Sequence, residues 1–459
     1  MRRTTILTLL ALASTPAAAA PAPGDPLSGY VLWGPNAQPI ARIVLNGVNQ
    51  PCPSLAGGTA MTARTNPNPA TFPITVCEAL VPPGQTTSIT VNGRTVSLPA
   101  ANPNPADIAI YGDSGCKAPG QDCGAATWPW PALVQAGAAR NPDLVIHVGD
   151  YNYRGTPNKV SVNGQTVWVY DGCGTTGVTS QNAPGSSLPD NWADWQADFF
   201  APAAPLLAEA AWVVMRGNHE LCSRAGPGWF YLLDPRSNLL GPGHAEMSCP
   251  VPATAPDISP TYTIPLKPVT LVMFDSANAC DYQSFAPLDP AVTAAYAPLL
   301  QAVQAQFAGG SGWFMTHRPL LGVWSTVAGP TGQTVTTYGN QTMLPALGTP
   351  PVLPAGAALT VSGHMHLFQS STPASGLPPQ LVVGNGGVQL QPAGTPATYQ
   401  SSLNGVAFSG TTLSSFGWLW IDRITGPANW SGTLLGADGS TQGSCGQPVA
   451  NGSVCALAN

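Results

Sequence analysis

The sequence places side chains of metal-binding types at the ends of several apolar runs. Asp113 follows the run 107–111, Asp150 follows 144–148, and Asn218 follows 212–215. Four of the six histidines also come directly after such runs or beside Asn218. Carboxylate and amide oxygens and imidazole nitrogens form the donor set that zinc, iron or manganese uses in proteins. The pattern therefore predicts a metal-dependent site that contains Asp113, Asp150, Asn218, His219, His317, His364 and His366.

An α/β layer architecture would bring these side chains together. The runs 107–111, 144–148 and 212–215 are typical of short buried strands, and helical patterns separate them. In such folds, ligands bind beyond the C-terminal ends of the strands. Helices are expected at about 132–139 and 192–211, later strands at 269–274, 312–315, 358–362, 381–383, 405–408, 417–422 and 430–434, and long loops at about 154–190, 222–262 and 320–356.

Residues 29–99 carry a different pattern, with short β-type runs and frequent turns. The pair Asn92-Gly93 stands between the runs 88–91 and 95–98, which is a strong signal for a two-residue hairpin. Regular turns without a helical period predict a small antiparallel β-sandwich. The proline-containing segment 100–106 is interpreted as a linker.

The N-terminus has the features of an export signal. Arg2 and Arg3 precede an apolar stretch at 6–13 and a small-residue segment that ends at Ala20, which is the order of a secretory signal peptide. A buried N-terminal helix is the alternative, but the flanking residues favour export. We therefore expect a signal peptide at 1–20 and a periplasmic or extracellular location.

Ten cysteines in an exported chain predict up to five disulfides. No CxxC pair occurs, which argues against a zinc-finger-like site. Cys116 and Cys222 stand close to the candidate metal ligands; disulfides that hold their loops are expected there rather than thiolate ligation. The first pairs expected from proximity are Cys52–Cys77 and Cys445–Cys455.

The composition excludes several classes of protein. Charged residues make up only 8% of the chain and the net charge is −6, so no nucleic-acid-binding surface is indicated. No apolar run reaches the roughly 18 to 20 residues needed to span a bilayer. The 50 glycines and 50 prolines could indicate disorder, but 13 tryptophans and a 44% apolar fraction predict a sizeable core. The oligomeric state has no signature in the sequence.

Four short motifs occur in a characteristic order along the chain: Gly112-Asp113-Ser114-Gly115 (GDxG), Gly149-Asp150-Tyr151-Asn152-Tyr153 (GDxxY), Gly217-Asn218-His219-Glu220 (GNH[D/E]) and Gly363-His364-Met365-His366 (GHxH). In this order they resemble the calcineurin-like metallophosphoesterases, and specifically the purple acid phosphatase branch. A fifth motif, VxxH, has Phe314 in place of valine before His317. The resemblance covers about residues 107–390.

The resemblance implies a fold and a domain division. The expected fold is α/β, a four-layer α/β/β/α metallophosphoesterase sandwich with a small N-terminal all-β domain. The N-terminal β-sandwich-like domain would span 21–105 and the catalytic domain 106–459. The C-terminal strands would complete the second sheet.

The resemblance also implies two metal ions. Asp113, Asp150, Tyr153 and His366 would hold the first, and Asp150, Asn218, His317 and His364 would hold the second, with Asp150 bridging. Tyr153 as a phenolate favours Fe(III) at the first site, with Fe, Zn or Mn at the second. His364 and His366 would share one face of a regular strand, so a turn must let them reach different metals.

The implied reaction is hydrolysis of a phosphate monoester by a metal-bound hydroxide. His219 would stabilise or protonate the leaving group. Arg154 and Arg224, at the starts of predicted long loops, are candidates for binding the small phosphate ester substrate through phosphate oxygens. Glu220 either orients His219 or occupies a surface or helix-start position.

Other interpretations stay open. A phosphodiesterase acting on nucleotides or lipid head groups would use the same motifs. A different class is an exported binding protein with a vestigial metal site, which should have lost at least one ligand. Singly, Asp113 could cap a helix and His317 or His364 could be structural; only the ordered set favours the metal site.

Overall fold

The structure is a computed structural model that describes residues 20–118, 120–154, 159–162, 165–168, 190–250, 256–281, 290–329, 332–391, 397–450 and 453–458. The expected signal segment, apart from Ala20, and Cys173 lie outside these residues.

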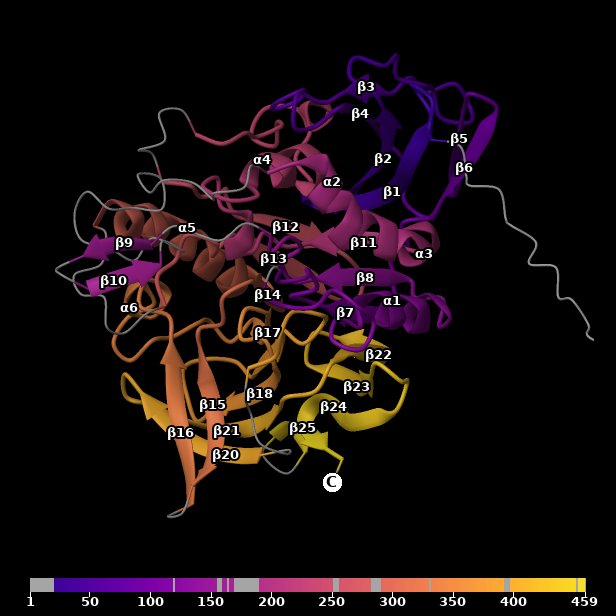
Figure 1. Cartoon of the computed structure of the whole chain (residues 1–459). Helices are drawn as coiled ribbons and strands as arrows, with labels where there is room; N and C mark the ends of the chain where they lie inside the picture. Colours follow the sequence, from indigo (N-terminus) through magenta and orange to yellow (C-terminus); the bar gives the residue numbers. More distant parts are fainter. Residues whose placement is uncertain are drawn as a thin grey trace, which may run out of the picture.

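Two large sheets face each other at the centre of the molecule (Figure 1). Within the described residues the first sheet has eleven strands and the second has eight. Parallel pairing links β7, β8, β11 and β1 in the first, and β13, β14, β17 and β19 in the second. In spatial order, the first sheet contains β25 (Ser453–Leu457), β24 (Thr441–Ala450), β23 (Asn429–Gly436), β22 (Gly417–Gly426), β7 (Ile108–Tyr111), β8 (Leu144–His147), β11 (Ala211–Val214), β1 (Pro26–Gly34), β2 (Gln38–Asn46), β4 (Ile74–Leu80) and β3 (Thr62–Ala63). The second contains β12 (Tyr262–Pro265), β13 (Thr270–Phe274), β14 (Gly312–Thr316), β17 (Ala357–Ser362), β19 (Gln380–Val383), β18 (Phe368–Pro373), β21 (Val406–Leu413) and β20 (Ala397–Leu403).

The central strands are buried on both faces, which explains their nearly continuous apolar sequences. In β7, Ile108 and Ile110 enter the core between the two sheets, whereas Ala109 and Tyr111 pack on the outer side. This alternation is the two-residue period of a strand. The core between the sheets thus positions the strand ends that carry the candidate site.

Helices cover the outer face of each sheet. Leu133 of α1 and Leu206 of α3 pack with Tyr111 and Trp212 outside the first sheet. Tyr296 and Leu300 of α5 belong to the apolar cluster outside the second sheet. The four-layer α/β/β/α sandwich expected from the sequence is confirmed. The helical segments are α1 (Trp130–Ala138), α2 (Trp192–Trp195), η2 (Gln196–Phe200), α3 (Ala201–Glu209), α4 (Gly226–Gly228), η4 (Trp229–Leu233), α5 (Pro290–Gly309), α6 (Met343–Ala346) and the short turns η1 (Pro35–Ala37), η3 (Asn218–Glu220) and η5 (Asn238–Leu240).

The N-terminal region is all-β, as expected, but its main strands continue the first sheet. β1 runs parallel to β11 through the Leu32–Trp212 pair, and β2, β4 and β3 follow beside it. Like the central strands, β1 is apolar on both faces, so it suits an interior position. The Asn92-Gly93 hairpin joins β5 (Thr87–Val91) to β6 (Arg94–Leu98). The division near residue 105 therefore falls within a continuous sheet.

The C-terminal strands are shared between the two sheets. The sequence predicted that they would complete the second sheet, but only β20 and β21 join it, and β22 to β25 extend the first. The physical reason is the open edge of β7, which pairs antiparallel with β22. Leu419 and Ile421 then enter the core between the sheets, and Trp418 stacks on Tyr111 outside it.

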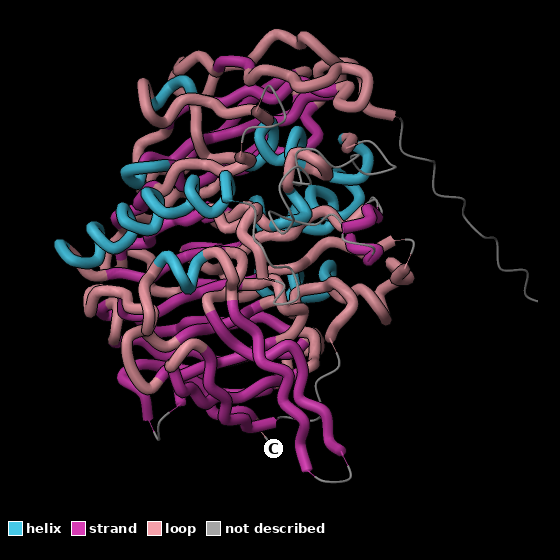
Figure 2. Tube along the Cα trace, turned by 90° about the vertical axis from the view of Figure 1, so that its left-hand side faces the viewer, coloured by secondary structure: helices cyan, strands magenta, loops and turns pink. Residues whose placement is uncertain are grey.

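The prediction of a long loop at 320–356 is wrong for the first half of this range. β15 (Leu321–Gly329) and β16 (Gly332–Gly339) form an antiparallel ribbon, which projects from the body of the molecule in Figure 2. Much of the predicted loop at 154–190 lies outside the described residues, which include the β9 (Lys159–Val162) and β10 (Gln165–Trp168) pair. In the predicted loop at 222–262, the described residues form the short helical segments α4, η4 and η5 before β12.

Disulfides tie down several loops. The expected pairs Cys52–Cys77 and Cys445–Cys455 are both present, and Cys116–Cys123 and Cys222–Cys249 bridge the loops beside the candidate site. Cys280 is also disulfide-bonded. None of the helices among the described residues is both long and apolar enough to cross a membrane.

Candidate metal centre

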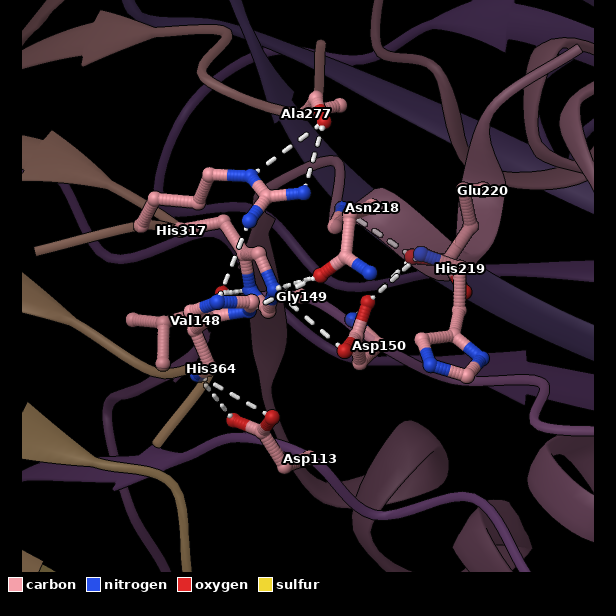
Figure 3. A network of polar contacts seen from close by, with 12 residues as sticks. Asp113, Val148, Gly149, Asp150, Asn218, His219, Glu220, Ala277, His317 and His364 are labelled. Atoms are coloured by element: carbon pink, nitrogen blue, oxygen red, sulfur yellow. Dashed lines mark hydrogen bonds and ion pairs between the residues drawn. The ribbon is translucent and has the colours of Figure 1, made fainter. Parts of the chain in front are cut away.

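The candidate ligands lie where the C-terminal ends of parallel strands from both sheets meet. β7 and β8 lead into Asp113 and Asp150, and β11 leads into Asn218 in the turn η3. From the second sheet, β14 leads into His317 and β17 into the loop with His364 and His366. Figure 3 shows the side chains of Asp150, Asn218, His317 and His364 pointing toward one another.

Four of these ligand positions have a backbone conformation that is unusual for residues with a side chain. The φ angles are 55° at Asp113, 61° at Asp150, 74° at His364 and 49° at His366. Such left-handed conformations are energetically costly and concentrate at functional sites. The two histidines therefore leave strand geometry, which allows them to join different ligand groups.

Glycine at position 149 is required by close packing. Its φ is +106°, and a Cβ there would overlap Nδ1 of His317 and press on the backbone of Gly217. Because Gly149 has no side chain, its turn (Gly149-Asp150, the GD turn) can approach both His317 and the turn at Gly217-Asn218 (the GN turn).

The first group of donors contains Asp113, Asp150 and His366, with one ligand atom of each within 4.8 Å of the others. The Tyr153 hydroxyl lies among them, 3.0 Å from Asp113 Oδ1, 2.9 Å from Asp150 Oδ2 and 3.1 Å from His366 Nε2. All four side chains assigned to the first metal thus converge.

The second group contains Asp150, His317 and His364, again within 4.8 Å. Asn218 Oδ1 lies 3.0 Å from His317 Nε2 and 2.9 Å from His364 Nδ1. Asp150 belongs to both groups, so its carboxylate has the position of a bridging ligand.

The proton positions at His317 show that this cluster fits a cation. Nδ1 lies 2.7 Å from the carbonyl oxygen of Val148, which can only accept, so Nδ1 must donate. Nε2 then faces two further acceptors, Asn218 Oδ1 at 3.0 Å and Asp150 Oδ2 at 3.3 Å. A positive charge is needed at this point, either a proton on Nε2 or a metal ion in its place.

The ionisation of the buried groups leads to the same conclusion. Burial raises the pKa of Asp113 to about 8, and the neighbouring Asp150 adds to the rise. Burial alone would lower the pKa of His317, but Asp150 outweighs it and raises the pKa to about 9. The cluster thus holds protons tightly where metal ions would supply the missing positive charge.

Glu220 connects the two loops that carry Asp150 and Asn218 through hydrogen bonds to their backbones. Its carboxylate accepts N–H groups from Asp150 at 3.0 Å, Tyr151 at 2.8 Å, Asn152 at 3.2 Å and Gly217 at 3.0 Å. It is fully buried, so it is not a surface residue and its carboxylate binds backbone rather than the His219 ring. Its place in the GNHE motif marks it in the sequence, but nothing in the sequence shows which groups it holds.

His219 lies beside the first group, with its ring centre 3.8 Å from that of Tyr153. Its backbone N–H donates to Asp150 Oδ1 at 2.9 Å. Arg224 Nη2 lies 2.7 Å from its Nδ1. Burial, together with this guanidinium, holds the pKa of His219 well below its usual range, so the imidazole is neutral.

The two arginines proposed for substrate binding have different surroundings. Arg224 is buried against His219. Arg154 donates through Nε and Nη2 to the carboxylate of Asp198, at 2.9 and 2.7 Å. Two of the Arg154 nitrogens thus bind the helical segment 192–209 and not the proposed metal ligands.

The sequence interpretation missed Asp281. Its Oδ2 lies 2.5 Å from Nε2 of His364, on the side of the ring away from Asn218. Asp281 stands in a loop outside all the motifs, next to Cys280, and no local pattern marks it.

A family model for calcineurin-like phosphoesterases matches residues 107–254, which carry Asp113, Asp150, Tyr153 and Asn218. This part of the chain matches the calcineurin-like phosphoesterase domain. Proteins of this family are metal-dependent phosphoester hydrolases with a dinuclear metal centre, and both candidate donor groups are present here.

The fold of the chain is similar to that of purple acid phosphatase PPD1 from yellow lupin (Lupinus luteus) seeds. The TM-score is 0.54 at 13% identity, and the match covers 92% of this chain and 74% of that one. GAP50 of Plasmodium (TM-score 0.38, 11% identity, 76% of this chain and 90% of that one) and a dimetal phosphatase from Danio rerio (0.39, 11%, 73% and 97%) are more distant. No curated protein matches the chain.

Proposed function

We propose that the protein is an exported phosphoesterase with two metal ions that hydrolyses phosphate monoesters, in the manner of an acid phosphatase. The observation that carries this proposal is the convergence of seven donor side chains in two groups that share Asp150. No proposed ligand has been replaced, which argues against a vestigial site.

The first ion would be held by Asp113, Asp150, Tyr153 and His366, and the second by Asp150, Asn218, His317 and His364. When bound, two such ions supply a water-derived nucleophile and neutralise charge on the phosphoryl oxygens. The residues of the chain fix the separation and the orientation of the two groups.

Iron(III) is proposed for the first position because of Tyr153. Burial, with the adjacent Asp113 and Asp150, raises the pKa of its phenol well above the usual value. Only a strongly charged cation would displace that proton, and a phenolate oxygen is a hard donor. The second group lacks a phenol and suits Fe, Zn or Mn.

His219 would donate a hydrogen bond to the leaving-group oxygen. Arg224 has only donors, and its Nη2 lies 2.7 Å from Nδ1 and 3.2 Å from Nε2 of His219; we therefore assign the accepting lone pair to the nearer Nδ1 and the proton of the neutral ring to Nε2. Arg224 is proposed to bind a phosphoryl oxygen beside it. Arg154 would have to do so with the part of its guanidinium that does not bind Asp198.

Export is proposed from the cysteine pairing together with the N-terminal sequence. Four disulfides lie within the described residues. Such bonds persist in oxidising compartments and are rare in the cytosol of mesophiles.

The test is a comparison of p-nitrophenyl phosphate with bis(p-nitrophenyl) phosphate, using metal-loaded protein across acidic to alkaline pH. We expect hydrolysis of the monoester, loss of activity in Asp150→Ala, and a fall in kcat of about 10²- to 10⁴-fold in His219→Ala. His244→Ala, at a histidine outside the centre, is the matched control and should remain active. Preferred hydrolysis of the diester would show a phosphodiesterase, and no hydrolysis by fully loaded protein would show a vestigial site.

A further inference from the structure

We propose that Asp281 is a positioning residue that keeps His364 in the form that binds the second metal ion through Nδ1. This inference rests on the proposed metal centre but on no property of the substrate. The carboxylate is buried, with 1% of the residue exposed, and it reaches the His364 ring from the side opposite Asn218.

The position of the imidazole proton follows from this contact. A carboxylate oxygen 2.5 Å from Nε2 can only accept, so the ring proton must be on Nε2. Nδ1 then has its lone pair free and directs it toward Asn218 Oδ1, 2.9 Å away. A lone pair and a carbonyl oxygen repel each other unless a cation lies between them. Asp281 thus fixes which nitrogen faces the second metal position.

Arg318 is the competing neighbour of Nε2. Its Nη1 lies 3.1 Å from that nitrogen and also donates to Asp281 Oδ2. If Nε2 accepted from Arg318 instead, its lone pair would face the carboxylate oxygen at 2.5 Å, which is repulsive. The consistent arrangement has both the imidazole and the guanidinium donating to Asp281.

The carboxylate is itself held in place. Tyr338 Oη donates to the same oxygen at 3.2 Å, and the Arg318 charge compensates that of Asp281 in a fully buried setting. Backbone contacts fix the segment, because Cys280 N–H donates to Thr342 Oγ1 at 2.8 Å and Cys280 is disulfide-bonded. Since Arg318 follows His317 directly, Asp281 links the two histidine-bearing loops of the second group.

Carboxylates that accept from a metal-bound histidine orient the ring and raise its basicity, and their loss typically lowers metal affinity by about 10- to 100-fold. Among the hydrogen-bonding partners Arg318, Tyr338 and His364, only His364 is a proposed ligand. The effect should therefore fall on the second metal ion.

The experiment measures binding of Zn²⁺ to the full-length, metal-free protein by competition with a chromophoric chelator. In Asp281→Asn we expect one equivalent to bind about 10- to 100-fold more weakly than in the wild type and the other equivalent to bind as in the wild type. Asp257→Asn is the matched control, because it also removes a buried carboxylate that pairs with an arginine, Arg216, but contacts no proposed ligand. The proposal would be overturned if Asp281→Asn bound both zinc equivalents with wild-type affinity. It would also be overturned if the substitution weakened both equivalents to the same extent.

A second measurement is made on the wild-type protein, and a variant serves only to assign its signals. Long-range ¹H–¹⁵N spectra of zinc-loaded wild-type protein labelled at histidine, with His364 assigned from His364→Gln, should show the proton of that ring on Nε2. A proton on Nδ1 would refute the proposal directly. If the wild type binds fewer than two zinc ions, the proposed metal centre itself fails; if it binds two but hydrolyses no ester, only the proposed function fails.

Discussion

The carboxylate of Glu220 is the hub of the ligand loops. It accepts four backbone N–H groups, from the GD loop at Asp150, Tyr151 and Asn152 and from Gly217 of the GN turn. A carboxylate can accept all four because both of its oxygens have lone pairs. The same group therefore sets the position of two loops that carry proposed ligands.

Glu220→Gln should disrupt this hub although the side chain keeps its shape. The amide nitrogen of glutamine would face two N–H donors and leave them unsatisfied, at a cost of about 1–3 kcal/mol for each buried group. We expect a lower melting temperature and weaker metal binding, measured by differential scanning fluorimetry and metal analysis. Glu209→Gln, on the exposed end of α3, should change neither. Wild-type stability and metal content in Glu220→Gln would show that the hub is unimportant.

Tyr153 provides an optical test of the first metal. Iron-loaded protein should have a visible charge-transfer absorption that Tyr153→Phe abolishes, because the phenol oxygen is lost while the packing of the ring on His219 is retained. Tyr151→Phe is the matched control, since the Tyr151 hydroxyl donates to the carbonyl of His147 and not to a proposed ligand. A colourless wild-type protein that is fully loaded and active would instead indicate zinc or manganese.

At the scale of the elements, the strands that carry the site were predictable because their signals are local. The run before Asp113 is short and apolar on both faces, and it stops at a glycine followed by a polar residue. The same holds before Asp150. A strand of this kind must lie inside an α/β sheet, and its C-terminal end must face the ligand side.

The elements that were predicted incorrectly, or not at all, depend on contacts that are remote in the sequence. β1 looks like a strand from its own residues, but only its pairing with β11 places it in the first sheet. β22 pairs with β7 for the same kind of reason. Asp281 is a single carboxylate whose proposed function depends on its contacts with His364 and Arg318, which are remote in the sequence.

At the scale of the whole molecule, a buried charge cluster joins the N-terminal strands to η4 and the residues that follow it. Glu78 of β4 pairs with Arg42 at 3.0 Å and Arg64 at 2.8 Å. The two guanidiniums also donate to backbone carbonyls in this segment, such as Leu232 at 2.9 Å and Phe230 at 2.6 Å. The cluster therefore ties the N-terminal strands to a segment that begins close to Arg224.

Glu78→Gln should be strongly destabilising, by about 3–5 kcal/mol, because two buried guanidiniums lose their counter-charge. Burial alone would raise the pKa of Glu78, but Arg42 and Arg64 hold it below the usual value. Its contribution to stability is therefore present above that usual value and is lost as the pH falls through the lowered pKa. Urea unfolding at neutral and acidic pH should show a large difference at neutral pH that shrinks in acid.

Asp422→Asn, which alters an exposed acidic residue of β22, serves as the control for that comparison and should unfold like the wild type at both pH values. A Glu78→Gln protein as stable as the wild type at neutral pH would mean that the cluster contributes little.

The pairing of Ile110 with Leu419 also constrains the order in which the protein can fold. While the chain is being synthesised, β7 is made long before its neighbour β22. Until then, the edge of the strand that leads to Asp113 stays open, and the many non-local pairings make folding slow. The strand that leads to Asp113 therefore gains its second neighbour only after every strand of the second sheet has been made.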